Sequence, residues 1–284
     1  MGKAVLGIDV GGSATKIVGF YETASGKKLI SPQLVQANDP LTSIYGAFGK
    51  FTMENGLSLQ DIDRVMMTGV GSTFAEKPLY EGLDCRVVSE FECVGTGGLY
   101  LSGLEEAIVV SMGTGTALIH AKKLPNGKVE ANYLGGTGVG GGTLMGLSHL
   151  LLGVDTIEHI AAMCEDGDIS NIDLRISDMT KKKLHPGMNR DLTAANFGKL
   201  NDMASKNDIA LGIANMVGET IGMLTVFAAR SCGIDRVVLT GNLTNLHAIR
   251  NVFPILEKTF PIHYIVPENA RYGTVIGAAL IEEN

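Results

Sequence analysis

The sequence has no closely spaced cysteines and no excess of positive charge, and each absence excludes a class of function. The four cysteines, Cys85, Cys93, Cys164 and Cys232, never show C-x-x-C spacing, which argues against a zinc site or an iron–sulfur cluster. Without a signal peptide they are most simply reduced thiols, so we expect a cytoplasmic protein. The formal net charge of −7 argues against nucleic acid as a partner, because such a partner would require a basic face.

Uninterrupted hydrophobic runs long enough to span a membrane are also missing. The most apolar long segment, residues 209–232, contains Asn215, Glu219 and Arg230. These polar side chains predict a buried or interface helix, and no membrane partner is expected.

Glycine, by contrast, is abundant and is concentrated in two similar segments. Residues 5–16 read VLGIDVGGSATK and residues 108–117 read IVVSMGTGTA, each an apolar strand, a small-residue turn and a second strand. Such turns let the backbone approach a ligand, and their consecutive N–H groups can bind an anion. Their spacing is neither that of a P-loop nor that of the dinucleotide fingerprint. One copy could be an ordinary hairpin turn, but two predict a duplicated fold that grips a nucleotide's phosphates, as in an ATP-dependent phosphotransferase.

Polar side chains in these hairpins suit the same ligand. Ser13, Thr15, Thr114 and Thr116 add hydroxyl groups. Asp9, at the end of the first strand, suits Mg²⁺, which favours one or two carboxylates together with phosphate oxygens and water.

The repeat extends beyond the hairpins. Residues 64–70 and 236–242 both predict buried strands that end in Thr-Gly, and an Ile-Asp pair precedes each. Strands that alternate with helices predict an α/β fold with a mainly parallel sheet, in which ligands collect at the carboxyl ends of strands. We expect an N-terminal half over residues 1–103 and a C-terminal half over residues 104–284.

The second half carries most of the additional sequence. A glycine run over residues 135–143 leads into a predicted helix over 144–152, whose N-terminus could receive an anion or merely follow a linker. Residues 165–186 are polar and predict a surface excursion. A small-residue helix is expected over 274–282, where Gly277-Ala278-Ala279 would allow tight packing or a nearby adenine ring.

A carboxylate is needed to accept the proton of the hydroxyl that is phosphorylated. Glu90 and Glu92 follow the apolar run Val87-Val88 and are the best candidates. If this run is a strand, alternation sends both side chains to one side, so spacing cannot choose between them. Charge at the start of a helix is the simpler alternative.

Together these motifs resemble the actin-like ATPase and sugar-kinase superfamily, and more narrowly the type II pantothenate kinases. The resemblance is collinear over nearly the whole chain. The residues that carry it are Gly7-Ile8-Asp9-Val10-Gly11-Gly12-Ser13, Glu90-Phe91-Glu92, Met112-Gly113-Thr114-Gly115-Thr116, the glycine run, and Asp191-Leu192-Thr193-Ala194-Ala195-Asn196-Phe197-Gly198.

The resemblance implies duplicated ribonuclease H-like domains with a nucleotide cleft between them. It implies a homodimer that uses ATP and Mg²⁺ to phosphorylate pantothenate to 4′-phosphopantothenate, the first step of coenzyme A biosynthesis. It also assigns the catalytic carboxylate to Glu90. By similarity the ATP site comprises Asp9, Gly11, Gly12, Ser13, Thr15, Lys16, Gly113, Thr114, Gly115, Thr116, Gly138, Gly140, Gly141, Gly142, Gly241 and Asn242, with Asp9 toward the metal. The acceptor site comprises Tyr133, Thr193, Ala195 and Asn196.

The chain departs from the family at Tyr133, where an arginine usually lies two residues before the glycine run. A tyrosine brings no charge and does not replace a guanidinium. Either Arg86, Arg190 or Arg271 fills that role, or the chain prefers another hydroxyl substrate.

Two alternatives therefore stay open. One is a kinase of an amino sugar or other small polyol, although such kinases usually use an aspartate base and no aspartate between residues 85 and 110 has a comparable context. The other is a non-kinase ATPase switch. The redox activators of this superfamily need closely placed cysteines, and the four here are far apart.

Overall fold

The computed structural model describes residues 2–12, 14–24, 26–36, 39–74, 79–180 and 189–282. The predicted site residue Ser13 lies outside these ranges. The chain forms two compact units, described separately below. Unit 1 comprises Met1–Val109, Ile119–Tyr133 and Pro267–Asn284, and unit 2 comprises Val110–Leu118 and Leu134–Val266. The boundary predicted after residue 103 separates the two halves of the duplication, and it stays a prediction.

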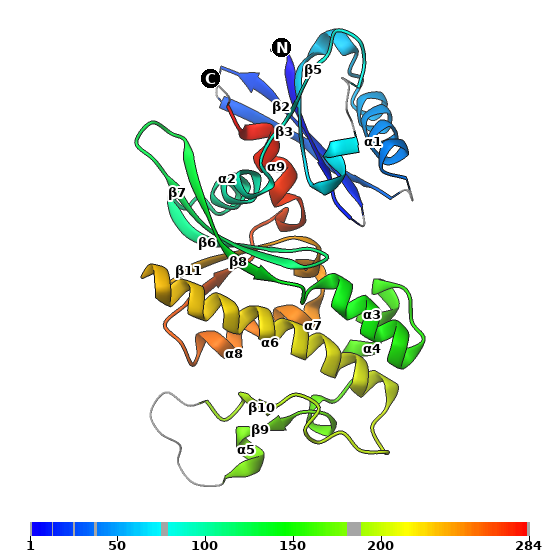
Figure 1. Cartoon of the computed structure of the whole chain (residues 1–284), viewed down its shortest axis with the longest axis vertical. Coiled ribbons are helices and arrows are strands. Elements are labelled where there is room, and N and C mark those ends of the chain that lie inside the picture. Colours follow the sequence, from blue (N-terminus) through cyan, green and yellow to red (C-terminus); the bar gives the residue numbers. More distant parts are fainter. Residues whose placement is uncertain are drawn as a thin grey trace. The chain divides into compact units, whose positions relative to one another are not determined.

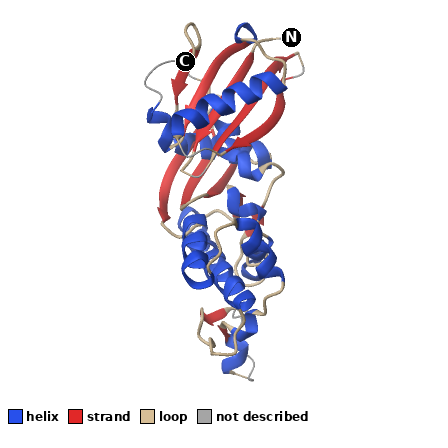
Figure 2. Cartoon of the chain, turned by 90° about the vertical axis from the view of Figure 1, so that its right-hand side faces the viewer, coloured by secondary structure: helices blue, strands red, loops and turns tan. Residues whose placement is uncertain are grey.

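The first sheet, in unit 1, has one central strand that is buried on both faces. Its order is β3 (Gly26–Val35), β2 (Thr15–Thr23), β1 (Ala4–Val10), β4 (Ile62–Thr68), β5 (Asp84–Val87). Strand β1 pairs antiparallel with β2 and parallel with β4. Leu6 and Ile8 pack toward α1 (Pro40–Glu54), which lies across one face of the sheet (Figure 2). Val5 and Gly7 point to the opposite face, as strand alternation requires, and meet α9 (Gly273–Leu280).

The second sheet repeats the strand order of the first. Its order is β12 (His263–Ile265), β11 (Arg236–Thr240), β6 (Glu106–Met112), β7 (Thr116–Lys123), β8 (Val129–Thr137). In each sheet the first strand of the half is central, the next two strands extend on one side, and two later strands extend on the other (Figure 1). This confirms the predicted duplicated α/β fold. The expectation of a mainly parallel sheet was wrong for the first sheet, where β1–β2 and β2–β3 pair antiparallel and β1–β4 and β4–β5 pair parallel.

Helices make up most of the rest of unit 2. Its helices are α3 (Gly141–Leu152), α4 (Ile157–Glu165), α5 (Ile176–Met179), α6 (Lys206–Cys232), α7 (His247–Arg250) and α8 (Phe253–Glu257). The short strands β9 (Leu174–Arg175) and β10 (Thr193–Ala195) pair antiparallel in the excursion that precedes α6. This excursion is not wholly superficial, because Asp173 at its centre is fully buried.

Helix α6 is the longest of the described helices, and most of the other helices of unit 2 pack against it. Ser205 and Asp208 cap its N-terminus reciprocally, with Ser205 Oγ accepting from Asp208 N–H at 3.1 Å. Among the described helices it alone is long and apolar enough to cross a membrane by length and composition. However, 56% of its most apolar window is buried within the structure. It contacts α3, α4, α7 and α8, which agrees with the buried alternative of the prediction, while the interface alternative stays a prediction.

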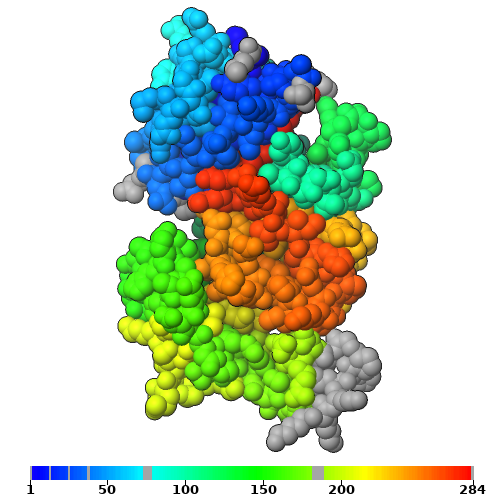
Figure 3. All heavy atoms as spheres, turned by 180° about the vertical axis from the view of Figure 1, so that it is seen from behind, coloured from blue at the N-terminus to red at the C-terminus, as the bar shows by residue number. Residues whose placement is uncertain are grey.

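Helix α2 (Glu90–Ser102) crosses α9 at glycines, within unit 1. A Cβ atom placed on Gly97 would lie 1.8 Å from the carbonyl oxygen of Gly273, and one on Gly277 would lie 1.8 Å from that of Cys93. Real side chains cannot occupy such positions, so the two backbones touch directly. The small-residue helix predicted near the C-terminus therefore does pack tightly. Seen from behind, the red C-terminal atoms adjoin the blue atoms of the first strands (Figure 3).

Candidate active site

The first hairpin places two oppositely charged side chains side by side in unit 1. Asp9 and Lys16 are register partners on β1 and β2, and each is only 8% exposed. Burial raises the pKa of Asp9 to about 6, although Lys16 opposes the change. Burial likewise lowers the pKa of Lys16. Neither side chain forms a hydrogen bond or close ion pair with another described residue, so both remain able to bind a ligand.

The turn of this hairpin is open, while its flanks are fixed. Gly11 and Gly12 are exposed, and Gly11 N–H donates to the carbonyl of Ala14 at 3.1 Å. Thr15 is buried and its hydroxyl accepts from Ser43 Oγ on α1 at 2.8 Å. In this structure Thr15 therefore anchors the hairpin to the helix, and the exposed glycines are the part that could meet phosphate.

Each half has a Thr-Gly pair that closes on the end of its own central strand. Gly69 and Gly241 both adopt positive φ, +85° and +94°. A Cβ on Gly69 would lie 2.6 Å from the carbonyl oxygen of Val10, and one on Gly241 would lie 2.5 Å from that of Met112. The preceding threonines, Thr68 and Thr240, are buried and donate their hydroxyls to Val88 O and Val110 O, both at 3.0 Å. The Thr-Gly repeat seen in the sequence thus corresponds to the same backbone contact, made once in each half.

Glu90 is the first residue of helix α2, which follows the N-cap Ser89. The expectation that Glu90 and Glu92 lie on a strand was wrong, because β5 ends at Val87 and the helix begins three residues later. Helical geometry sends residues two apart to different sides, so the two carboxylates are not equivalent. Burial raises the pKa of Glu90, and Lys16 lowers it. Glu90 also contributes to the raised pKa of Asp9, so these three charges lie near one another.

The second hairpin, in unit 2, is held by its own backbone. Gly113 N–H donates to Gly115 O at 2.9 Å, and the Thr116 hydroxyl donates to Val139 O at 2.9 Å. Thr114 O accepts from Gly142 N–H at 2.8 Å. The predicted phosphate residues Gly113, Thr114, Gly115 and Thr116 are therefore close to the glycine run.

The glycine run is expected from the sequence to lead into a helix over residues 144–152, and the structure differs. Its first residues belong to β8, and α3 begins at Gly141. Gly141 N–H donates to Gly113 O at 2.8 Å, and a Cβ on Gly140 would lie 2.6 Å from Thr114 O. The N–H groups of Gly141 and Gly142 thus hold the second hairpin and are not free for a phosphate. Gly138, whose carbonyl accepts from the Thr143 hydroxyl at 2.9 Å, lies in the bend between β8 and α3.

The last two residues of the predicted ATP site, Gly241 and Asn242, follow β11 in unit 2. Gly241 packs on Met112, next to Gly113, as described above. Asn242 begins a short 3₁₀ helix, and its side-chain oxygen is buried without a hydrogen-bond partner. A buried acceptor of this kind can take a donor from a ligand.

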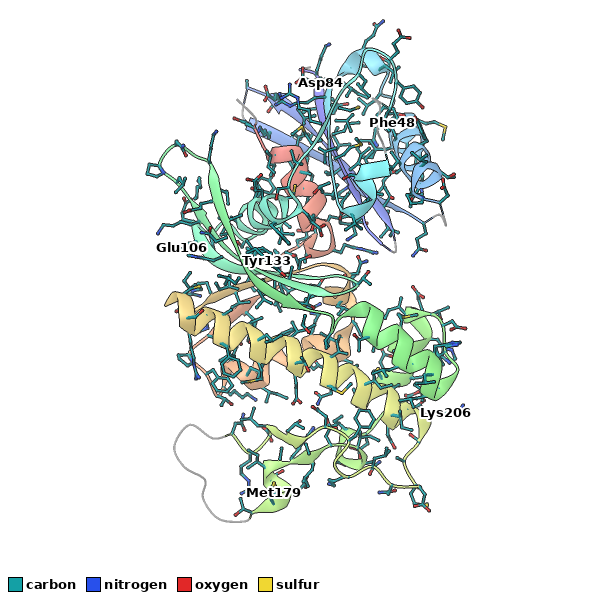
Figure 4. The ribbon with its side chains drawn as sticks, in the orientation of Figure 1. Phe48, Asp84, Glu106, Tyr133, Met179 and Lys206 are labelled. Carbon is teal, nitrogen blue, oxygen red and sulfur yellow. The ribbon has the colours of Figure 1, made fainter. Side chains whose placement is uncertain are left out.

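Tyr133 stacks on Phe91 within unit 1. The ring centroids are 4.2 Å apart and the planes differ by 11°. Both rings are partly exposed, Tyr133 at 51% and Phe91 at 38%. Figure 4 shows Tyr133 on β8 beside α2, the helix that carries Phe91 next to Glu90.

The remaining predicted acceptor residues are bound to a carboxylate network in unit 2. Thr193 Oγ1 donates to Glu219 at 2.7 Å, and Asn196 Nδ2 donates to the other Glu219 oxygen at 2.9 Å. Asp173 accepts from Asn215 Nδ2 at 2.8 Å and from Phe197 N–H at 2.7 Å. Ala195 O accepts from Gly198 N–H at 3.1 Å and closes the turn.

The structure thus groups the predicted residues into two sets. Unit 1 holds Asp9, Gly11, Gly12, Thr15, Lys16, Glu90 and Tyr133; unit 2 holds Gly113, Thr114, Gly115, Thr116, Gly138, Gly140, Gly141, Gly142, Gly241, Asn242, Thr193, Ala195 and Asn196. Sequence reasoning missed Asp173 and Phe91 as parts of these sets. Phe91 could have been found from its place beside Glu90, whereas nothing in the local sequence marks Asp173.

The chemistry of the first hairpin fits Mg²⁺ bound through phosphates. No described cluster of three or more His, Cys, Asp or Glu residues could hold a metal by protein ligands alone. Mg²⁺ commonly needs only one or two carboxylates and takes its other ligands from phosphate and water. The buried Asp9 carboxylate, which lacks a hydrogen-bond partner among the described residues, meets that need.

Comparison with known proteins places this arrangement in a family. The Fumble family model matches residues 105–253. A type II pantothenate kinase of Oceanobacillus iheyensis is 31% identical over 70% of this chain and 76% of its own length. A type II pantothenate kinase from a strain of Bacillus cereus is 28% identical over 99% of both chains.

A solved structure agrees with the fold. The activator of the 2-hydroxyisocaproyl-CoA dehydratase from Clostridium difficile, with bound ADPNP, superposes with a TM-score of 0.65 at 18% identity, covering 98% of this chain and 93% of that one. At that identity the likeness concerns the actin-like fold alone. The family model and the relatives found by sequence establish more than the fold. They show that the chain belongs to the Fumble family of type II pantothenate kinases.

Proposed function

We propose that this chain transfers the γ-phosphoryl group of ATP to the primary hydroxyl of pantothenate, giving 4′-phosphopantothenate for coenzyme A synthesis. The observation that carries the proposal is the family membership, since the relatives that match over most of the chain are named type II pantothenate kinases. The charge cluster of unit 1 supports it, because phosphoryl transfer requires a base for the hydroxyl and positive charge for the phosphoryl group.

Glu90 accepts the hydroxyl proton in this mechanism. Its place at the start of α2 leaves the carboxylate accessible, and partial burial raises its pKa toward the range in which a base works well. Lys16 lies close enough to influence Glu90 and carries positive charge toward the phosphates. Asp9 would hold Mg²⁺, which when bound neutralises charge on the β- and γ-phosphate oxygens.

The other residues bind and orient the two substrates. The exposed Gly11 and Gly12, with Ser13, bind phosphate oxygens in unit 1. Gly113, Thr114, Gly115 and Thr116 bind phosphate oxygens in unit 2, while Gly138, Gly140, Gly141 and Gly142 hold that second hairpin. Gly241 and Asn242 contact the adenosine. Tyr133 in unit 1, and Thr193, Ala195 and Asn196 in unit 2, contact the acceptor. The protein acts as a soluble, cytoplasmic homodimer.

An acceptor-dependent assay tests the proposal. ADP release should require pantothenate, and amino sugars should not replace it. Glu90→Gln should abolish turnover while ADPNP still binds, and Glu92→Gln, changed on the same helix turn, should keep most of the activity. ADP release that is independent of pantothenate, or normal turnover by Glu90→Gln, would refute the assignment.

A further inference from the structure

Unit 1 contains three arginines, and two of them already have partners. Arg86 forms a fork with Asp84, with Nη2–Oδ2 and Nε–Oδ2 distances of 2.9 and 3.0 Å. Arg64 lies 3.7 Å from the Asp63 carboxylate. Arg271 has no ion pair or hydrogen bond with any described residue, and its Nε is buried and unsatisfied. Arg190, which sequence reasoning also considered, belongs to unit 2 and donates to Thr180 O at 3.2 Å.

Arg271 is held rigidly in spite of lacking a polar partner. It lies in the 3₁₀ turn Ala270–Tyr272 that leads directly into α9, after Asn269 in the left-handed conformation. Its guanidinium carbon lies 5.4 Å from the ring centroid of Tyr272. Gly273, two residues on, is the residue whose carbonyl touches Gly97 of α2. The glycine crossing therefore fixes Arg271 relative to the helix that begins with Glu90.

The guanidinium also lies near the first hairpin. Helix α9 packs on β1 at Gly7, two residues before Asp9 in the strand. A Cβ atom on Gly7 would lie 2.4 Å from the carbonyl oxygen of Val275 on α9. Burial lowers the pKa of Lys16, Asp9 opposes this, and Arg271 adds to the lowering. Lys16 and Arg271 are thus two cations close enough to influence each other. The buried Nε of Arg271 still lacks a partner, and a buried donor without a partner is costly unless a ligand supplies one.

We infer that Arg271 binds an oxygen of the transferring γ-phosphoryl group, together with Lys16. This inference rests on the proposed function for the identity of the acceptor, but not for the nucleotide contact. Tyr133 contributes no charge and is already stacked on Phe91. A guanidinium can donate in a fork to a phosphate, which a lysine cannot. Arg271 therefore supplies the cation that stabilises charge in the transition state.

The test compares nucleotides that differ at the γ-phosphate. Arg271→Met should weaken ADPNP binding about tenfold, because a hydrogen bond to a charged group is lost, while ADP binding stays within about twofold. Turnover at saturating substrates should fall by about 10²- to 10³-fold. Arg271→Lys should retain more of both activities. Arg86→Met, in the same unit but paired with Asp84, is the matched control. It should change neither the ratio of ADPNP to ADP affinity nor the turnover.

A second measurement separates contact from folding. Guanidinium ion added to Arg271→Ala should restore part of the turnover, which a purely structural role would not allow. Equal loss of ADPNP and ADP affinity, or turnover within about threefold of wild type, would overturn the inference. Because the ADPNP-to-ADP ratio needs no acceptor, it stays decisive even if pantothenate proves to be the wrong substrate.

Discussion

Phe91 stacks on Tyr133 one residue away from the proposed base. The ring centroids are 4.2 Å apart, and the two residues come from α2 and β8. The pair thus ties the first turn of α2 to β8, beside the carboxylate that is proposed to accept the proton of the hydroxyl.

Removing this stack should disturb the acceptor more than the nucleotide. Tyr133→Ala should raise KM for pantothenate about three- to tenfold, in line with about 0.5–1.5 kcal/mol for an aromatic pair. Tyr133→Phe keeps the ring and should behave like wild type. Tyr100→Ala, which removes an edge-to-face contact with Phe20 elsewhere on α2, is the control. If it raised KM equally, general loosening of the helix would be the explanation.

The pH dependence of turnover should report Glu90. A base must be ionised, so kcat falls as pH falls through its pKa. Because burial raises that pKa, the acidic limb should lie above the value of about 4.3 for a free glutamate. Lys16 opposes the rise, so Lys16→Met should move the limb to still higher pH. A pH profile of kcat under saturating substrates measures both, and an unmoved limb in Lys16→Met would contradict the assignment.

Asp9 should reduce stability at neutral pH in the absence of Mg²⁺. Its pKa rises from 3.8 to about 6 on folding. A carboxyl with a raised folded-state pKa stabilises the fold while protonated, and this contribution is lost as pH rises through about 6. The ionised form then costs on the order of 3 kcal/mol. Asp9→Asn should therefore be more stable than wild type near neutral pH and inactive.

Urea unfolding with a chelator present measures this difference. The gap between Asp9→Asn and wild type should shrink as pH is lowered toward about 4, where both side chains are neutral. A gap that stays constant with pH would show that titration of Asp9 is not its cause.

The glycine crossing should be intolerant of any side chain. Gly97→Ala would force a methyl group into the carbonyl of Gly273, so we expect loss of several kcal/mol, about 3 or more. Gly49→Ala lies in α1 with nothing within 4 Å of the new atom. That control should be neutral or stabilising by about 0.5–1 kcal/mol. Thermal melts of the two variants would settle the comparison, and similar melting temperatures would count against backbone contact.

The sequence predicted those parts of the fold and site that depend on local pattern. Two glycine hairpins and two Thr-Gly strands were enough for the duplicated fold, because each signal lies within about ten residues. The start of α2 was misassigned, since Val87-Val88 continues the apolar pattern of β5 up to the Ser89 cap. Asp173 could not be found, because its partners lie 23, 24 and 42 residues away. The unpartnered state of Arg271 likewise depends on the whole fold.

The paired Thr-Gly contacts constrain how this scaffold could be re-engineered. Gly69 and Gly241 each lie against the last carbonyl of a central strand, so neither loop can accept a side chain without moving that strand. New acceptor specificity must therefore be built elsewhere, and the excursion between α4 and α6, which carries the proposed acceptor residues Thr193 and Asn196, is the place to attempt it. Exchanging that excursion between relatives, with the cores of both halves kept unchanged, is the grafting strategy that this architecture favours.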